Sequence, residues 1–251
     1  MTDKRSAVPP DRRQLLAGMA GFAAAAGLSP PLLAGAPDVD LALVLAADCS
    51  GSVSPDFYML QQQGYADAFR SPDVIKAIRS GIHGGIAVCY IQWSGYSLQT
   101  QVIPWTLLKG DADIAAFAGQ MQQAGRGIYG GGTSPAGAIR QGRLLLGDLQ
   151  TEGRPFLAVR RVIDVSGDGR TNVGPAPDAD RAEAMALGIT INGLPILHME
   201  PDIDEYYARE VIGGPGAFIV PARSFDAFRE AIRRKLILEI AGRPVMARPA
   251  G

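Results

Sequence analysis

The 251-residue sequence lacks, or has few of, several features that commonly indicate a function. Its formal net charge is −1, so it lacks the basic excess typical of proteins that bind nucleic acid. It has only two histidines, His83 and His198, and no Gly-x-Ser-x-Gly segment. A serine nucleophile such as Ser52 would therefore lack a recognisable base and the usual turn around it. Beyond the N-terminal region, no apolar run approaches the roughly 18 residues of a membrane span. We expect no nucleic-acid partner and no catalytic residues.

Only two cysteines, Cys49 and Cys89, are present. Both lie in or beside apolar runs that predict neighbouring buried strands, where the geometry of a disulfide is hard to meet. Export to an oxidising compartment would allow a disulfide between them. The alternative is that both are small, buried apolar residues. The sequence favours the second interpretation and leaves the first open.

Residues 1–36 differ in character from the rest of the chain. Two adjacent arginines, Arg12 and Arg13, precede a weakly hydrophobic stretch rich in alanine and glycine, which is typical of a Tat-type export signal. The alternatives are an amphipathic N-terminal helix and a retained membrane anchor. Small residues at 34–36 would suit cleavage, but Pro37 directly after them is unfavourable, so the cleavage position stays open. We expect a periplasmic or secreted protein that meets a membrane only if the signal is uncleaved.

From residue 38 to about 242, apolar runs alternate with helical patterns. The nearly unbroken run at 39–47 predicts a strand buried on both faces, as in a parallel sheet. The link between the second and third runs is too short for a crossover, so the third strand should be antiparallel. The predicted strands are residues 39–47, 86–93, 97–107, 159–165, 189–197 and 216–220.

Helix signals lie between these strands. Ser54 followed by Pro55 predicts a helix with the serine as N-cap and the proline at the first helical position. Further helix starts are predicted at Asp111 or Asp113, at Ser134, near Asp180, near Asp204 and at Ser224. The alternation indicates one α/β domain over residues 38–242, with a mainly parallel six-stranded sheet and one antiparallel edge strand. Residues 243–251 are expected to form a loose tail.

Three loops place oxygen-bearing side chains at the carboxyl ends of strands, where open α/β sheets bind ligands. Asp48, Ser50 and Ser52 are alternate residues that can turn toward one point as the chain leaves its strand. Thr133 precedes a helix, and Asp168 follows the fourth strand. Two carboxylates and three hydroxyls suit Mg²⁺, which takes about six oxygens, and Mn²⁺ or Ca²⁺ are alternatives. The sequence therefore predicts a divalent-cation site with these five residues as ligands.

The order and spacing of these five positions resemble the metal-ion-dependent adhesion site of von Willebrand factor type A domains. The resemblance covers about residues 38–242, and segments 162–172 and 191–196 are similar to an exported bacterial group of uncharacterised function. It implies a Rossmann-like sheet with helices on both faces. It also implies metal-dependent binding of a partner protein through an Asp or Glu of that partner. Cys49 departs from the family pattern, where a small or β-branched residue is more usual, and should not touch the metal.

Two other functions stay open beside this binding module. One is a metal-dependent hydrolase, in which the cation acts as a Lewis acid on a phosphate or acyl substrate. The other is a structural domain that assembles an envelope complex without a metal. Each part of the pattern also has a simpler interpretation, because a capped turn or an ordinary loop would explain each segment taken alone.

Two competing motifs fail on their context. Asp164, Ser166 and Asp168 resemble the start of an EF-hand loop, but Pro175 stands where that loop needs a bidentate glutamate. Asp164 is instead expected either to accept a hydrogen bond from metal-bound water or to pair with a neighbouring polar group inside the protein. Residues 125–130 match a dinucleotide-binding glycine pattern but follow a helical stretch, not a strand. We expect these glycines to bring their loop close to the metal site.

Overall fold

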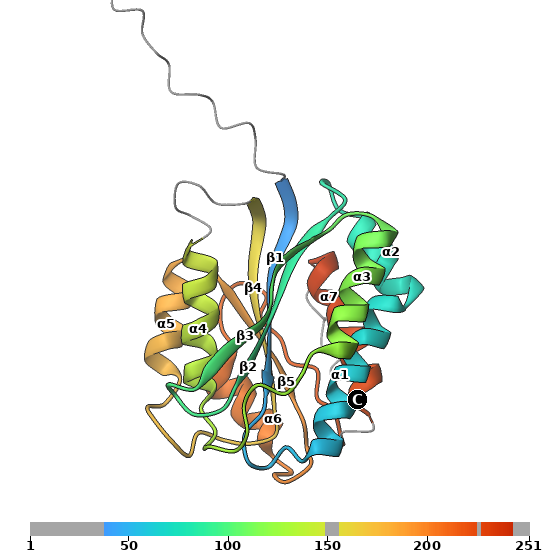
Figure 1. Cartoon of the computed structure of the whole chain (residues 1–251). Helices are drawn as coiled ribbons and strands as arrows, with labels where there is room; N and C mark the ends of the chain where they lie inside the picture. The colour runs from blue at the N-terminus through green and yellow to red at the C-terminus, as the bar shows by residue number, and fades with distance from the viewer. Residues whose placement is uncertain (1–37, 149–155, 225–226, 243–251) are drawn as a thin grey trace, which may run out of the picture. The chain divides into compact units, whose positions relative to one another are not determined.

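A twisted, mostly parallel sheet lies between two layers of helices (Figure 1). The computed structural model describes residues 38–148, 156–224 and 227–242, so the predictions for residues 1–36 and 243–251 lie outside the described residues. The strand order is β3-β2-β1-β4-β5, and only β3 runs antiparallel to its neighbour. The strands are β1 (Asp38–Asp48), β2 (Ile86–Trp93), β3 (Gln99–Leu108), β4 (Leu157–Gly167) and β5 (Thr190–Pro195).

Helices cover both faces of the sheet, as the resemblance implies. In Figure 1, α4 and α5 lie on one side, and α1, α2, α3 and α7 lie on the other. Alternate side chains of β1 feed two hydrophobic cores, one under each layer. The helices are α1 (Pro55–Arg70), α2 (Pro72–Arg79), α3 (Asp111–Gln123), α4 (Pro135–Asp148), α5 (Asp178–Ala186), α6 (Ile203–Tyr206), the π-helical turn η1 (Tyr207–Val211) and α7 (Phe228–Ala241).

The central strand β1 explains why the α/β class was predictable. Leu41 to Ala47 are all buried, because β2 and β4 pair with its two edges and helices cover its two faces. Burial of each leucine or valine side chain in this run contributes about 1.5–3 kcal/mol to folding, and burial of each alanine contributes less. The fold class, the mainly parallel sheet and the antiparallel edge strand are therefore confirmed.

The predicted sixth strand at 216–220 is wrong, and the described sheet has five strands. The segment pairs with β5 at one isolated bridge, Gly193 with Ile219, and a second isolated bridge, Ile196 with Ala222, lies just beyond the end of both. Gly214 has φ +93° and Gly216 has φ +70°, so the backbone turns where a strand would need to extend. Local apolar content predicted a strand there, but the turn prevents a continuous ladder.

Helix starts were predicted with mixed success. The Ser54 prediction is confirmed, because its hydroxyl accepts a hydrogen bond from the backbone N–H of Phe57 at 3.2 Å. Neither aspartate caps α3: Gly110 is the N-cap, and Asp113 accepts a hydrogen bond from its N–H at 3.0 Å. Helix α2, which follows α1 almost directly, was not predicted.

The last helix begins at Phe228 and not at the predicted Ser224. The hydroxyl of Ser224 accepts a hydrogen bond from the N–H of Ala227 at 3.3 Å, one residue before the helix begins. Near the predicted helix at 204–212, the chain forms α6 and then the π-helical turn η1. Tyr207, at the start of the π turn, is fully buried.

Cys49 and Cys89 are free and buried, on opposite faces of the sheet. Cys49 belongs to the core beneath α1 and Cys89 to the core beneath α4, so the sheet separates their side chains. This confirms the interpretation of both as small buried residues. Within the described part of the chain, no helix is long and apolar enough to cross a membrane.

Candidate metal site

The turn after β1 brings its alternate side chains together. Asp48 is the last residue of β1, and its Oδ1 accepts a hydrogen bond from the N–H of Ser50 at 2.7 Å. The hydroxyl oxygens of Ser50 and Ser52 lie 3.2 Å apart. Asp48 and Ser50 are buried, whereas Ser52 is exposed. The turn therefore presents one carboxylate and two hydroxyls in a line from the interior to the surface.

Asp168 joins this group from the neighbouring strand. It lies one residue beyond the end of β4, and the hydroxyl of Ser52 donates a hydrogen bond to its Oδ1 at 2.7 Å. The two strands are parallel neighbours, so their carboxyl ends reach the same edge of the sheet. Asp168 is only 1% exposed, which makes it a second buried carboxylate at this edge.

Thr133 reaches the same point from the glycine-rich loop before α4. Its N–H donates to Oδ1 of Asn172 at 2.7 Å, and the N–H of Asn172 donates to its carbonyl at 3.0 Å. A Cβ placed on Gly169 would lie 3.5 Å from Oγ1 of Thr133, so this hydroxyl lies beside the residue after Asp168. The structure thus brings together all five residues that the sequence singled out.

The glycine-rich loop lies close against the turn after β1. Gly131 has φ +86°, a conformation that favours glycine, and its carbonyl oxygen would lie 3.5 Å from a Cβ on Gly51. The hydroxyl of Ser94 lies 2.7 Å from the carbonyl oxygen of Gly130 and 2.8 Å from that of Gly132. Close approach of this loop, as expected from its glycines, is what positions Thr133.

Arg126, whose role was not predicted from the sequence, joins these two loops. Its guanidinium donates to the carbonyl oxygen of Val53 at 2.8 Å and to that of Cys49 at 3.0 Å. The same group lies over the rings of Tyr58 and Tyr129, at 5.6 and 5.4 Å from their centroids. Only an arginine offers several donors in one plane for such a contact. The signal in the sequence that could have identified Arg126 is the presence of an arginine within a glycine-rich segment.

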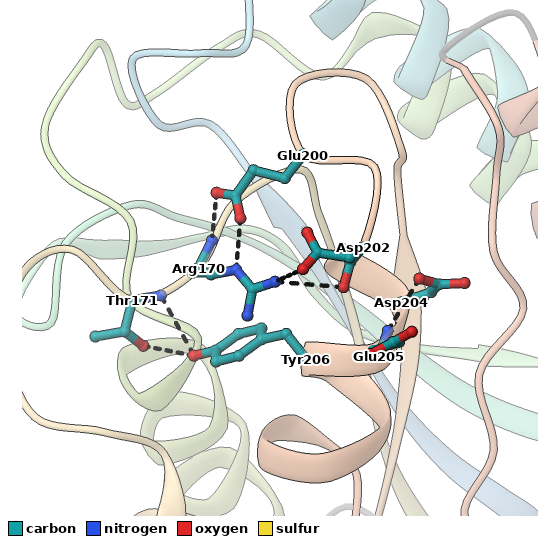
Figure 2. Close-up of polar contacts among 7 residues, drawn as sticks. All are labelled: Arg170, Thr171, Glu200, Asp202, Asp204, Glu205 and Tyr206. Carbon is teal, nitrogen blue, oxygen red and sulfur yellow. Dashed lines mark hydrogen bonds and ion pairs between the residues drawn. The ribbon is translucent and has the colours of Figure 1, made fainter.

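Arg170 holds the loop after β4, and its role was likewise not predicted from the sequence (Figure 2). Its Nε lies 2.7 Å from Oε2 of Glu200, and its Nη2 lies 2.7 Å from Oδ2 of Asp202. Next to it, the hydroxyls of Thr171 and Tyr206 lie 2.8 Å apart. These contacts tie the loop that carries the second carboxylate to the segment leading into α6.

Two carboxylates in one buried place create an electrostatic problem. Desolvation, together with the nearby charge of Asp168, raises the pKa of Asp48 to about 7. Desolvation also raises the pKa of Asp168. Oδ2 of each residue is buried and has no hydrogen-bond partner among the described residues. A cation bound here would neutralise the repulsion and satisfy these oxygens.

The donor set has the chemistry of a hard divalent cation site. Two carboxylates and three hydroxyls supply only oxygen, as Mg²⁺ and Ca²⁺ prefer. Within the described ranges, no three His, Cys, Asp or Glu side chains gather in a way that could hold a metal. Any cation here would therefore depend on the serine and threonine hydroxyls as much as on the two aspartates.

Asp164 does not contribute to this site. It pairs through its Oδ1 with Nζ of Lys235 at 2.7 Å, and both side chains are fully buried. Lys235 also pairs with Glu239, which accepts a hydrogen bond from Asn192 at 2.9 Å. This cluster faces α7, on the other side of the sheet from Asp48. Of the two interpretations of Asp164, the structure shows the buried carboxylate paired with a polar neighbour.

The sequence matches, over residues 38–244, the family described as "Protein of unknown function (DUF1194)". The chain belongs to this family. No curated protein matches the sequence.

Solved structures show the same fold. Proximal thread matrix protein 1 from the mussel byssus is 16% identical with a TM-score of 0.57, and the match covers 81% of this chain and 48% of that one. The pilus adhesin SpaC from Lactobacillus rhamnosus GG is 17% identical with a TM-score of 0.56, covering 81% and 30%. A von Willebrand factor type A structure from Catenulispora acidiphila is 17% identical with a TM-score of 0.55, covering 80% and 43%.

These similarities establish a von Willebrand factor type A-like fold for the chain. It spans less than half of the length of each of these proteins. The mussel protein has also been solved with a zinc-occupied metal-ion-dependent adhesion site, at 16% identity and a TM-score of 0.56.

Proposed function

We propose that the protein is an exported binding module that uses a divalent cation to bind an acidic group of a partner protein. Asp48, Ser50, Ser52, Thr133 and Asp168 are the ligands, some through water, and Mg²⁺ is the cation, with Mn²⁺ or Ca²⁺ as alternatives. The observation that carries the proposal is the pair of buried carboxylate oxygens, Oδ2 of Asp48 and of Asp168, without partners in the described structure. They lie at an edge where three hydroxyls converge.

The donor set favours an acidic ligand from outside. Two carboxylates balance the charge of one divalent cation, and the three neutral hydroxyls donate little electron density to it. The cation would keep its attraction for a further anion, which an Asp or Glu of a partner supplies. Ser52 is exposed, so the site opens toward solvent on the side where a partner would approach.

The surroundings of the site suit a protein partner. Tyr129 is 77% exposed, next to the guanidinium that fastens the loops. Leu98 and Val173 are 44% and 43% exposed. Their side chains border the glycine-rich loop, at 3.4 and 2.5 Å from Cβ positions built on Gly131 and Gly132. Exposed aromatic and aliphatic groups around a polar centre are typical of protein interfaces.

Calorimetry of the protein with Mg²⁺ and Mn²⁺ tests the metal site. We expect saturable binding of one cation and its loss in Asp48→Ala. Asp56→Ala is a matched control, because Asp56 is an exposed aspartate in the first turn of α1. This variant should bind the cation with unchanged affinity. No binding by the unsubstituted protein, or equal binding by Asp48→Ala, would reject the site.

Affinity capture from the periplasm, with and without EDTA, tests the partner. We expect at least one protein to be retained in Mg²⁺, released by EDTA and absent when Asp48→Ala is the bait. Partners that are retained equally in EDTA would favour a structural role without metal. Metal-dependent turnover in a hydrolase screen would favour the enzyme alternative.

Export is part of the proposal and rests on the N-terminal sequence alone. Arg12 and Arg13 before a weakly hydrophobic stretch support a Tat-type signal over residues 1–36. Replacing both arginines by lysine should retain the protein in the cytoplasm of a Tat-competent host. Unchanged appearance of this variant in the periplasm would reject the assignment.

A further inference from the structure

Asn172 is the hydrogen-bond partner of both backbone groups of Thr133. The N–H of Thr133 donates to Oδ1 of Asn172 at 2.7 Å, and the N–H of Asn172 donates to the carbonyl oxygen of Thr133 at 3.0 Å. A residue has one backbone donor and one backbone acceptor, so this single neighbour satisfies both. The two bonds run in opposite directions between the same two residues. They therefore fix the distance and the orientation of Thr133 relative to the loop after β4.

A close approach at Gly132 makes room for this pair. A Cβ built on Gly132 would lie 2.7 Å from Oδ1 of Asn172 and 2.5 Å from Cγ1 of Val173. Any side chain at this position would push Asn172 away from Thr133. The φ of Gly132 is not positive, unlike that of Gly131, so space and not backbone conformation requires a glycine here.

The loop that carries Asn172 also carries Asp168 and is held between them. Arg170 and Thr171 lie between these two residues and contact the segment that leads into α6 (Figure 2). The position of Asn172 is therefore set by the same loop that sets the position of Asp168. Through its two hydrogen bonds, that loop also sets the position of Thr133.

An asparagine suits this place beside the two buried carboxylates. Its side-chain oxygen accepts the N–H of Thr133 without adding a charge. An aspartate would accept the same N–H but would bring a third carboxylate to an edge where burial already raises the pKa of Asp48 and of Asp168. Neither hydrogen bond uses the hydroxyl of Thr133, whose Oγ1 lies beside Gly169.

We propose that Asn172 is a positioning residue of the metal site, which sets Thr133 relative to Asp168 so that the hydroxyl and the carboxylate reach one cation. The effect on the cation rests on the function proposed above, but the hold on Thr133 does not. Groups that orient metal ligands typically change metal affinity by about 10–100-fold when they are lost.

Asn172→Ala removes the side-chain acceptor and tests the effect on the cation. Calorimetry of the full chain should show the Kd for Mg²⁺ rising at least about tenfold. Asn172→Asp keeps an oxygen that accepts the N–H of Thr133, so it should lose little or none of the affinity. An unchanged Kd in Asn172→Ala, or an equal loss in both variants, would overturn the effect on the cation.

Asp113→Ala is the matched control for the alanine variant. Asp113 is exposed, as Asn172 is, and its side chain also accepts a backbone N–H, that of Gly110 at 3.0 Å. This contact lies at the start of α3, so its loss should leave the Kd for Mg²⁺ unchanged. A rise equal to that of Asn172→Ala would show that any lost contact of this kind weakens binding, and would overturn the proposal.

Amide hydrogen exchange in EDTA, followed by NMR, tests the hold on Thr133 without any metal. In Asn172→Ala the N–H of Thr133 should exchange about fivefold faster, as expected when one neutral hydrogen bond is lost, whereas Asn172→Asp should keep the slow rate. The N–H of Cys49, which donates to the carbonyl oxygen of Trp93 at 2.8 Å, is the reference and should be unaffected. An unchanged rate at Thr133, or an equal change at Cys49, would overturn the hold. If the unsubstituted protein binds no Mg²⁺, the metal function fails, and the exchange rates still decide whether Asn172 holds Thr133.

Discussion

The hydroxyl of Ser52 donates a hydrogen bond to Oδ1 of Asp168 at 2.7 Å, although 116 positions separate the two residues. The contact joins the turn after β1 to the end of β4 at the exposed side of the site. It also shows that the hydroxyl and the carboxylate lie close enough to share one cation. When a cation binds, Asp168 would face the cation in place of the hydroxyl proton of Ser52.

Two serines in one turn should separate metal binding from stability. Ser52→Ala removes a proposed ligand, so we expect the Kd for Mg²⁺ to rise by about 10–100-fold, the range seen when groups that support a metal site are lost. Ser54→Ala removes the N-cap of α1, so we expect it to lower the free energy of unfolding by about 1 kcal/mol with an unchanged Kd. Calorimetry and urea unfolding measure the two effects. Weaker Mg²⁺ binding in Ser54→Ala alone would contradict the assignment.

The pH dependence of stability follows from Asp48. Its pKa is raised to about 7 in the folded protein, so the folded state holds its proton more tightly than the unfolded chain does. In EDTA, stability should therefore fall as pH rises, by on the order of 1 kcal/mol between pH 6 and 8. Added Mg²⁺ should offset this loss, with a larger gain at pH 8 than at pH 6. Thermal unfolding in both conditions measures it.

Asp48→Asn provides the control for this pH dependence. Asp164, whose pKa is also raised to about 7 by burial and by Glu239, contributes its own slope in every variant. The part due to Asp48 is the difference in slope between the unsubstituted protein and Asp48→Asn. Identical slopes in EDTA would show that Asp48 does not titrate in this range.

Arg126 should affect the cation site without being a ligand. In Arg126→Ala the turn after β1 and the glycine-rich loop lose their shared hydrogen bonds, so Ser52 and Thr133 are no longer held together. We expect Mg²⁺ affinity to fall about tenfold, and Arg126→Lys to recover little of it because lysine lacks the planar set of donors. Arg140→Ala is the control, since that exposed arginine lies over Tyr96. Full recovery with lysine would argue for a simple charge effect.

The buried lysine on α7 should matter for stability alone. Lys235→Met leaves Asp164 and Glu239 buried without their cation, so we expect a loss of about 3–5 kcal/mol in the free energy of unfolding. Combining it with Asp164→Asn and Glu239→Gln should recover most of that loss. Arg233 lies on the same helix but makes exposed ion pairs, with Asp73 of α2 and with Glu230, so Arg233→Ala should cost less than about 1 kcal/mol. Urea unfolding measures the stability of these variants. If the triple substitution recovers none of the loss, the lysine stabilises the protein through packing and not through its charge.

Parts of the fold were predictable because they depend on neighbours in sequence. The apolar run of β1 and the Ser54-Pro55 helix start carry their information within a few residues. The strand prediction at 216–220 was wrong because it also used only local information. The apolar content of this segment resembles that of a strand, but the turn at Gly214 and Gly216 prevents regular pairing. Helix α2 was missed although Ser71-Pro72 repeats the serine-cap and proline start of α1, because it follows α1 directly and its start signal falls on the residue that also ends α1.

The sequence by itself determined the fold class and the five oxygen-bearing residues, because strand ends and caps are local and the order of the loops is fixed by the chain. Tertiary structure alone decided what surrounds them. Arg126 and Arg170 reach carbonyl oxygens and carboxylates far along the chain. Asp164 turns away from the site and pairs with Lys235 of α7. Such contacts depend on strand register and on the side from which a helix covers the sheet, and neither is encoded in any short segment.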